Sequence, residues 1–244
     1  MDTVMQRRRT YLLMECMPKL GLLMHGYNSD CFHFGSQSEG TTTPGLQSDI
    51  DFLFCNNNGN IMREWEDWQG GMFNYLLFHD ETTPPQQFLL LKVRPDTPEL
   101  EVCLVDDVHV RKDSGQVMLS SKRWKQEIES IVKNTDEVTN SGPSMSWVTN
   151  WDIVHAVQIR KPLPEILHWR DRCRDKHWPP VQLLEAARIA PCFLVPAGNP
   201  DSVYKSEEWR LSPNLIERML MFSFNIRQIK CYIGLKLNET IIVC

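Results

Sequence analysis

The chain has 244 residues, of which 42% are apolar and 23% are charged, so its composition is that of an ordinary folded protein. This length fits one large domain or two small ones, and the composition excludes intrinsic disorder, collagen, coiled coil and disulfide-rich miniproteins. Lys and Arg total 26 against 31 Asp and Glu, and the net charge of −5 excludes a protein that coats nucleic acid along its whole surface.

Neither the N-terminus nor the cysteines indicate export. A short apolar run follows Arg7 to Arg9, but Glu15, Pro18 and Lys19 interrupt it, so no cleavable leader is expected. No stretch approaches the ~20 apolar residues of a membrane span. The eight cysteines are scattered without a CxxC pair, which is typical of reduced thiols. We therefore expect a cytoplasmic or nuclear protein with no membrane partner.

The first predicted element is a helix over residues 11–23, where apolar residues recur at spacings of one, three and four. Pro18 should kink this helix or split it in two. Residues 35–47 form a predicted polar loop that is rich in Gly, Ser and Thr. A strand follows over residues 49–54, because apolar side chains alternate there with other residues.

The middle of the chain combines strands with one amphipathic helix. The helix is predicted over 121–132, with Ser121 as its N-cap and Trp124 and Ile128 on its apolar face. A polar connection over 136–146 then leads to a strand over 147–159. Three further strands are expected before this helix, over 88–93, 100–110 and 117–119.

The pattern changes beyond Pro162, where we expect only helices. These predictions give an α+β lobe over residues 1–162 and a helical lobe over residues 163–244. The expected helices of the second lobe are one over 164–176, one beginning at Pro180, one through Leu215, Met219 and Phe222, and one over 229–236.

The most informative segment for function is Gly35-Ser36 followed by Asp49 and Asp51. Side chains two residues apart on a strand share a face, so the two carboxylates should stand side by side. A cation between them would relieve their repulsion, and Mg²⁺ prefers such oxygen ligands while leaving positions for water and phosphate. The turn at Gly35 and Ser36 offers backbone amides and a hydroxyl to a phosphate.

Asp152 is the candidate for a third carboxylate, because β-branched and aromatic residues flank it as in a strand. In a two-metal site a third acid helps to deprotonate the attacking hydroxyl. The plainer interpretation stays open for the first two acids, since Asp-x-Asp often occurs on the solvated face of a hairpin.

Further motifs carry a specific resemblance that extends from about residue 10 to residue 237. The chain resembles the Mab-twenty-one (male-abnormal) family, which contains cyclic GMP–AMP synthase and the invertebrate receptors similar to it, and it is most similar to mollusc-type members. The resemblance implies a two-lobed nucleotidyltransferase fold of the polymerase-beta type, with a mixed, mainly antiparallel sheet. The segments that carry it are Gly35 to Asp51, Asp80 to Pro85, Cys192 to Pro196, Glu208 to Ser212, and Gln228 to Tyr232.

The resemblance implies a metal-dependent catalytic triad. Asp49 and Asp51 match the first two metal-binding acids of the family, and Asp152 matches the third. The expected cofactor is Mg²⁺ or Mn²⁺.

The resemblance also implies residues that contact nucleotides. Gly35 and Ser36 match the phosphate-holding Gly-Ser of the family. Arg210 and Ser212 match a segment that contacts the acceptor nucleotide, and Lys236 is similar to a lysine that reaches the donor phosphates.

This sequence departs from the family pattern at the residues that would bind zinc. The vertebrate DNA sensor carries a zinc-binding insertion, whereas Cys231 here stands without one. His168, Cys173 and His177 lie near one another in the sequence but lack a fourth ligand, so no zinc is expected.

Other departures concern the ends and the basic residues. Residues 241–244 do not resemble the family, and we expect a truncated helical lobe without the aromatic residue that stacks on a base. Arg7 to Arg9 and the trio Lys122, Arg123 and Lys125 are interpreted as solvated faces rather than a nucleic-acid footprint.

These features predict a nucleotidyltransferase that makes a cyclic dinucleotide from ATP and GTP in innate immune signalling. A double-stranded nucleic acid could act as its activator only through a local basic patch. The alternative is an inactive or truncated family member that serves as a nucleotide-binding or partner-binding module.

Overall fold

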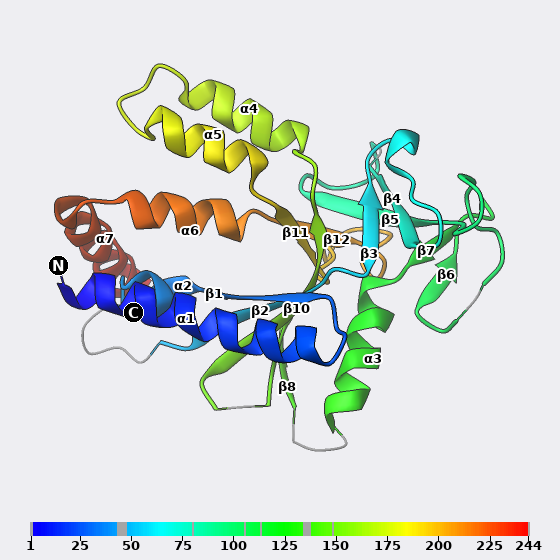
Figure 1. The fold of residues 1–244 in the computed structure, drawn as a ribbon, viewed down its shortest axis with the longest axis horizontal. Helices are drawn as coiled ribbons and strands as arrows, with labels where there is room; N and C mark the ends of the chain where they lie inside the picture. The colour runs from blue at the N-terminus through cyan, green and yellow to red at the C-terminus, as the bar shows by residue number, and fades with distance from the viewer. Residues whose placement is uncertain are drawn as a thin grey trace.

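The computed structural model describes residues 2–42, 48–79, 81–104, 106–112, 114–133, 138–147 and 149–243. The fold is mixed α+β, with a mostly antiparallel sheet (Figure 1). A 3₁₀ turn, η1, covers Trp65–Asp67. The seven α-helices in these ranges are α1 Asp2–Met24, α2 Gly35–Glu39, α3 Ser121–Lys133, α4 Pro164–Cys173, α5 Val181–Ile189, α6 Asn214–Ser223 and α7 Ile226–Val243.

The sheet has a main path in the order β1-β2-β10-β11-β12-β5-β4-β3. Two pairs on this path are parallel, β2 with β10 and β3 with β4, and the other pairs are antiparallel. Off the path, β7 pairs with β5 and β6, and β9 pairs with β8 and β10. The strands are β1 Ser29–Phe34, β2 Ile50–Asn56, β3 Gly59–Met62, β4 Phe73–Phe78, β5 Gln87–Val93, β6 His109–Arg111, β7 Val117–Leu119, β8 Thr139–Ser141, β9 Ser144–Ser146, β10 Trp151–Ile159, β11 Cys192–Val195 and β12 Trp209–Ser212.

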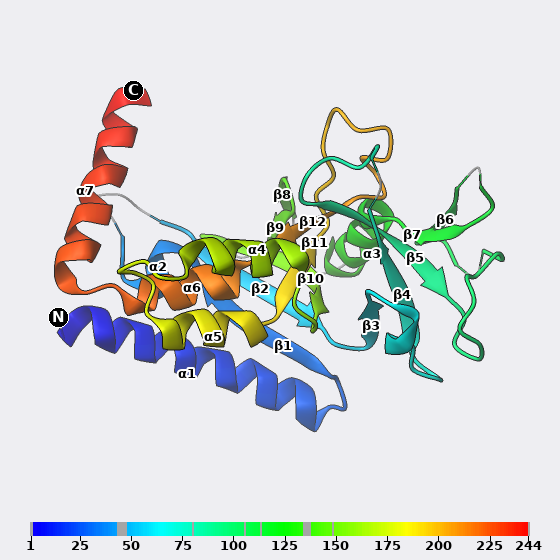
Figure 2. The same cartoon turned by 90° about the horizontal axis from the view of Figure 1, so that it is seen from above.

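The molecule is elongated along the direction of β1 and β2. Figures 1 and 2 show α1, α6 and α7 toward one end and the strands β4 to β7 toward the other. The start of α1 and the helix α7 lie at the same end. Helix α1 packs along the edge strand β1, and α6 packs against β1 and β11.

The segment after residue 162 is not purely helical, so that expectation is wrong. Strands β11 and β12 follow α5 and lie in the middle of the sheet. Trp209 on β12 is fully buried, and its Nε1–H donates to Leu119 O at 3.0 Å. The largest apolar cluster joins residues from both sides of position 162, among them Leu90, Ile159, Leu163 and Leu194.

Several predicted elements differ in extent from the observed ones. Helix α1 is longer than predicted and continues through Pro18. Most of the predicted strand over 100–110 is irregular, with only β6 at its end. The predicted polar connection contains the hairpin of β8 and β9, and β10 begins only at Trp151. Residues 43–47, 105, 136, 137 and 148 of these predicted elements, together with Asp80, lie outside the described ranges.

The N-cap of α3 is Ser120, one residue before the predicted cap. Its Oγ accepts a hydrogen bond from the backbone N–H of Arg123 at 3.3 Å, as the cap of a helix does. The hydroxyl of Ser121 instead donates to Ser206 O at 3.2 Å. The predicted cap residue therefore anchors the loop that precedes β12.

No helix in the described ranges is long and apolar enough to cross a membrane. The seven cysteines in those ranges are unpaired, and Cys244 lies outside them.

The outer edge of β1 is sealed at His33 by two charged side chains. The N–H of His33 donates to Glu15 Oε1 on α1 at 2.6 Å. Its carbonyl accepts from Arg218 Nη1 on α6 at 3.0 Å, and Arg218 also forms an ion pair with Glu15. An unpaired edge strand exposes such groups to other chains, so this clamp satisfies the edge and joins α1, β1 and α6.

Arg8 joins α1 to α2 and to the end of α6, and it is not part of a solvated face as predicted. The residue is buried, with 4% of its surface exposed. Its Nε–H donates to Glu39 O at 2.9 Å, and its two Nη groups donate to the carbonyls of Met221 and Phe222. Arg8 thereby fixes α2 and the end of α6 to α1.

The clamp leads to a prediction about stability. The side chains of Arg218 and Glu15 are only 9% and 12% exposed. Replacing Arg218 with Met leaves a buried, uncompensated carboxylate, which costs about 3 kcal/mol of unfolding free energy. Urea denaturation at pH 7 measures this loss. The double variant Glu15→Gln/Arg218→Met should lose less than the sum of the single variants, and strictly additive losses would contradict a coupled clamp.

Candidate functional site

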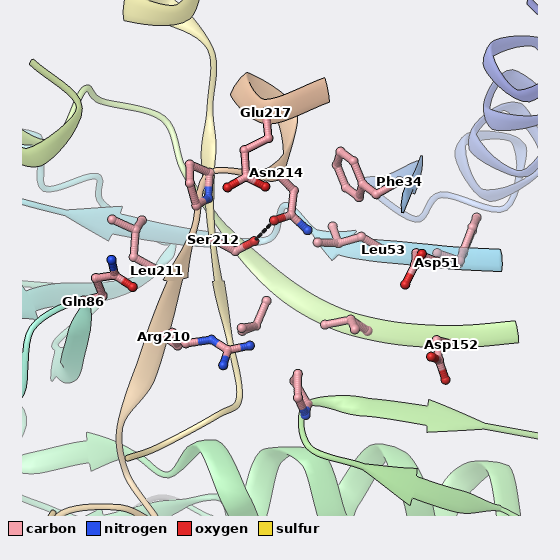
Figure 3. A pocket seen from close by; sticks show the side chains of 15 residues that line it. Phe34, Asp51, Leu53, Gln86, Asp152, Arg210, Leu211, Ser212, Asn214 and Glu217 are labelled. Carbon is pink, nitrogen blue, oxygen red and sulfur yellow. Dashed lines mark hydrogen bonds between the residues drawn. The ribbon is translucent and has the colours of Figure 1, made fainter. Parts of the chain in front are cut away.

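The structure places Asp51 and Asp152 side by side. Strand β2 carries Asp51 and β10 carries Asp152, and the two strands are parallel neighbours with these residues in register. Residues in register on adjacent strands point to the same face of a sheet. The two carboxylates therefore face the same side, as Figure 3 shows.

Asp49 belongs to the same electrostatic group, although it lies just before β2 rather than within it. Burial raises the pKa of Asp51 to about 6, and the nearby charges of Asp152 and Asp49 raise it further, in that order. Lys236 on α7 opposes these effects. Two acids and one lysine from separate parts of the chain thus act on the carboxylate of Asp51.

Gly35 fits closely against Asp51. It has a φ of +73°, which glycine adopts without strain, and it opens α2 directly after β1. A Cβ at this position would lie 1.9 Å from Asp51 Oδ2. The local geometry therefore requires glycine and brings the start of α2 next to the carboxylate.

The neighbouring Ser36 faces the other end of the loop that follows α2. Its Oγ lies 2.6 Å from Ser48 Oγ, and the side chain of Gln37 donates to Ser48 O at 2.9 Å. These contacts hold the segment before Asp49 against α2. Ser36, whose hydroxyl is expected to hold a phosphate, therefore directly follows the glycine that packs against Asp51. Its hydroxyl is paired with that of Ser48.

The carboxylate of Asp152 is oriented by a hairpin that the sequence did not predict. Ser146 Oγ on β9 donates to Asp152 Oδ1 at 2.9 Å, and Ser144 Oγ donates at 3.5 Å. The hairpin is in turn fixed by Lys125 on α3, whose Nζ donates to Gly142 O at 2.7 Å and to Ser144 O at 3.0 Å. Lys125 is therefore an internal anchor rather than a solvated lysine, and burial lowers its pKa.

Glu39, at the end of α2, is a buried acid that sequence reasoning did not select. Burial raises its pKa to about 7, Lys236 and Arg8 oppose the rise, and Glu217 and Asp51 add to it. The sequence signal was its position four residues after Gly35, on the same short helix. Lys236 acts on the carboxylates of both Glu39 and Asp51.

A cavity of about 390 Å³ opens beside the acid pair. Figure 3 shows Asp51 and Asp152 together at one side of it and Arg210 toward the other. Ser212 lies between them on β12 and donates to Asn214 Oδ1 at 2.7 Å. Gly35, Ser36, Asp49 and Lys236 are not among the described lining residues. Besides Asp51, Asp152, Arg210 and Ser212, the residues that line the cavity include Phe34, Leu53, Gln86, Leu211, Asn214 and Glu217.

Glu217 is the charged residue of this cavity wall that the sequence did not indicate. It comes from α6 and points toward the cavity from above in Figure 3. The one feature of the sequence that could have indicated Glu217 is its position three residues after Asn214, which places both on the same face of the helix. The cavity is therefore framed by acids at one side and by Arg210 at the other.

The donor chemistry of the acid pair fits a divalent cation. Carboxylate oxygens are hard ligands suited to Mg²⁺ or Mn²⁺, and a cation here would oppose the burial and the like charges that raise the pKa of Asp51. In the described part of the chain, no group of three or more His, Cys, Asp or Glu side chains lies close enough to hold a metal ion as it stands. Asp51 and Asp152 are two carboxylates that the fold brings together.

A scan against protein-family models matches none of them, and a search of curated proteins finds no match.

The close fit at Gly35 leads to a stability prediction. Gly35→Ala combines an unfavourable positive φ with a clash against Asp51, whereas Gly26→Ala has a φ of +80° and open space around the new Cβ. The control should lose about 1 kcal/mol of unfolding free energy. Gly35→Ala should lose at least about 1 kcal/mol more, because Asp51 must move. Urea denaturation compares the two, and equal losses would show that Asp51 does not fill this space.

The raised pKa of Asp51 leads to a pH prediction. The group takes up its proton near pH 6 in the folded protein and near 3.8 when unperturbed. Between these pH values the folded state binds more protons, so ionisation of Asp51 makes the folded protein less stable as pH rises.

Asp51→Asn removes this effect. In EDTA, its melting temperature should exceed that of the wild type at pH 7 to 8, and the difference should disappear below about pH 4. Thermal denaturation across this range tests the sign. A variant that is less stable than the wild type at pH 8 would contradict crowding of like charges.

Proposed function

We propose that this protein is a nucleotidyltransferase of the cyclic GMP–AMP synthase type, with a two-lobed fold of the polymerase-beta kind. One observation carries the proposal: Asp51 and Asp152 are register partners on parallel strands, with Gly35 packed against Asp51, at the side of a cavity. The family resemblance of the same residues supports it independently of their spatial arrangement.

The substrates would be ATP and GTP, bound in the cavity between the acid pair and Arg210. Arg210 and Ser212 would contact the acceptor nucleotide. Lys236, which acts electrostatically on Asp51, would reach the phosphates of the donor. Ser36 would orient the β- or γ-phosphate after giving up its contact with Ser48.

In the proposed reaction, a ribose hydroxyl of the acceptor attacks the α-phosphorus of the donor. A new P–O bond forms, the bond between the α-phosphorus and the bridging oxygen breaks, and pyrophosphate leaves. Asp51 and Asp152, with Asp49 nearby, would hold Mg²⁺, which when bound would supply charge neutralisation and lower the pKa of the hydroxyl. Two such transfers within one pocket would give a cyclic dinucleotide.

The side chains of the protein have distinct tasks in this scheme. Ser146 holds Asp152 in the orientation in which its carboxylate faces the cavity and can help remove the proton of the attacking hydroxyl. Gly35 keeps Asp51 in place. Binding in the cavity excludes water from the reacting groups and holds donor and acceptor together.

The proposal predicts that Asp51→Asn and Asp152→Asn each lower pyrophosphate release by at least about a hundredfold, because even an outer-shell partner of a metal is worth about 10- to 100-fold. ATP, GTP and Mg²⁺ are supplied with and without double-stranded DNA or RNA. Asp96→Asn is the matched control, since Asp96 is an exposed acid paired with Arg94.

Pyrophosphate release that is unchanged in the folded Asp51→Asn variant would contradict the catalytic assignment. Nucleotide binding by the wild type without any turnover would favour the alternative, in which the chain is a nucleotide-binding module.

A further inference from the structure

A second cavity, of about 570 Å³, adjoins the first. The two share Pro143 and Arg210 in their walls. This second cavity, called the basic groove from here on, lies between α3, the hairpin of β8 and β9, and the loop over 196–206. Asp51 and Asp152 lie on one side of the first cavity and Arg210 lies on the other (Figure 3). Arg210 also lines the basic groove, so the groove adjoins the side of the first cavity that is opposite the acid pair.

The basic groove is strongly cationic in a chain whose net charge is −5. Its described lining contains four basic side chains, those of Lys122, Lys125, Lys205 and Arg210, and one acidic side chain, that of Glu129. The Oε1 of Glu129 already accepts a hydrogen bond from Asn140 at 2.8 Å. The charge left in the groove is therefore positive, which favours an anionic ligand.

Three of the basic side chains form no ion pair and no side-chain hydrogen bond within the described ranges, although the charge of Lys122 acts on the nearby carboxylate of Glu207. Lys125 is bound to two carbonyls of the hairpin, whereas Lys122, Lys205 and Arg210 form no ion pair and no side-chain hydrogen bond with any described residue. Some exposed basic residues elsewhere do pair with acids, as Lys161 does with Asp67. The groove thus gathers cations whose donors remain available to a ligand.

The backbone segments that carry Lys122 and Lys205 are held together by hydrogen bonds. The carbonyl of Ser206 accepts from Ser120 Oγ at 2.8 Å and from the backbone N–H of Lys122 at 3.0 Å. This ties the backbone before Lys122 to the residue after Lys205. At Gly198 the loop approaches itself so closely that a Cβ would lie 1.9 Å from Lys205 O.

We propose that the basic groove binds the 5′-phosphate chain of the nucleotide that accepts the transferred group. This inference rests on the proposed function. The acceptor hydroxyl must lie at Asp51 and Asp152, so the rest of the acceptor extends across the first cavity toward Arg210. Its 5′ end then reaches the groove, where Lys122 and Lys205 meet the phosphates. The acceptor is accordingly a nucleoside 5′-polyphosphate rather than a nucleoside.

The first test measures binding without activity. Inorganic tripolyphosphate is titrated into the full chain by calorimetry at low salt. Lys122→Ala/Lys205→Ala should raise its Kd by about five- to thirtyfold, as expected for two partly exposed ion pairs. The matched control Lys176→Ala/Lys230→Ala removes the same charge from exposed lysines that line neither cavity, and its Kd should change less than twofold. Equal effects of the two double variants would overturn the inference.

The second test separates the acceptor from the donor. The donor is 2′,3′-dideoxy-ATP, which cannot accept, and the acceptor is either α,β-methylene-GTP, which cannot donate, or guanosine. Lys122→Ala/Lys205→Ala should raise the KM for α,β-methylene-GTP by about five- to thirtyfold and leave kcat and the KM for guanosine unchanged. An equal change in KM for both acceptors would overturn the inference.

The experiments distinguish failure of the proposed function from failure of the proposed phosphate site in the basic groove. No transfer by the wild type to either acceptor overturns the proposed function, whereas unaltered tripolyphosphate binding in Lys122→Ala/Lys205→Ala overturns the groove. A single-stranded oligonucleotide without a 5′ phosphate serves as a competitor in the calorimetry. If it displaces tripolyphosphate at lower concentration than GTP does, the groove takes a polynucleotide backbone and the assignment to an acceptor nucleotide is overturned.

Discussion

The parallel pairing of β2 with β10 brings two like charges into register, and much of the surrounding structure serves to hold them there. Asp51 and Asp152 face the same side of the sheet, in surroundings that raise the pKa of Asp51 to about 6. The missing side chain of Gly35 leaves the space that the carboxylate of Asp51 occupies, and the β9 hydroxyls orient Asp152. Such an arrangement costs stability, and a bound cation would offset this cost by neutralising the crowded carboxylates.

Helices α1, α2 and α6 connect the wall of the first cavity to the strands that carry Asp51 and Asp152. Arg218 and Glu15 join α6 and α1 to the edge strand β1, and Arg8 adds bonds from α1 to α2 and to the end of α6. Helix α6 carries Asn214 and Glu217 over the cavity. The acid pair, the short helix that begins at Gly35 and the cavity wall therefore belong to one connected framework. On the opposite wall, α3 supports both the hairpin that orients the acid and the basic groove.

The sequence was sufficient for the acids but not for what supports them. Alternation on a strand placed Asp51 correctly, and the flanking residues of Asp152 correctly indicated a strand. The hairpin over 139–146 escaped prediction because it is short and polar. Strand β1 escaped because Ser29, Asp30 and His33 interrupt its apolar residues, so its sequence lacks a regular alternation. Strands β11 and β12 lie between helical segments and have only four residues each. The buried role of Arg8 depends on carbonyls more than 200 residues away, which no local pattern encodes.

The most direct measurement is a crystal structure of the protein with Mn²⁺ and a non-hydrolysable ATP analogue, analysed by anomalous scattering. We expect manganese within ~2.0–2.2 Å of carboxylate oxygens of both Asp51 and Asp152, with the nucleotide phosphates completing its coordination. An ordered nucleotide in the cavity without manganese at these carboxylates, or manganese bound only elsewhere, would contradict the assignment of this acid pair as the catalytic metal site.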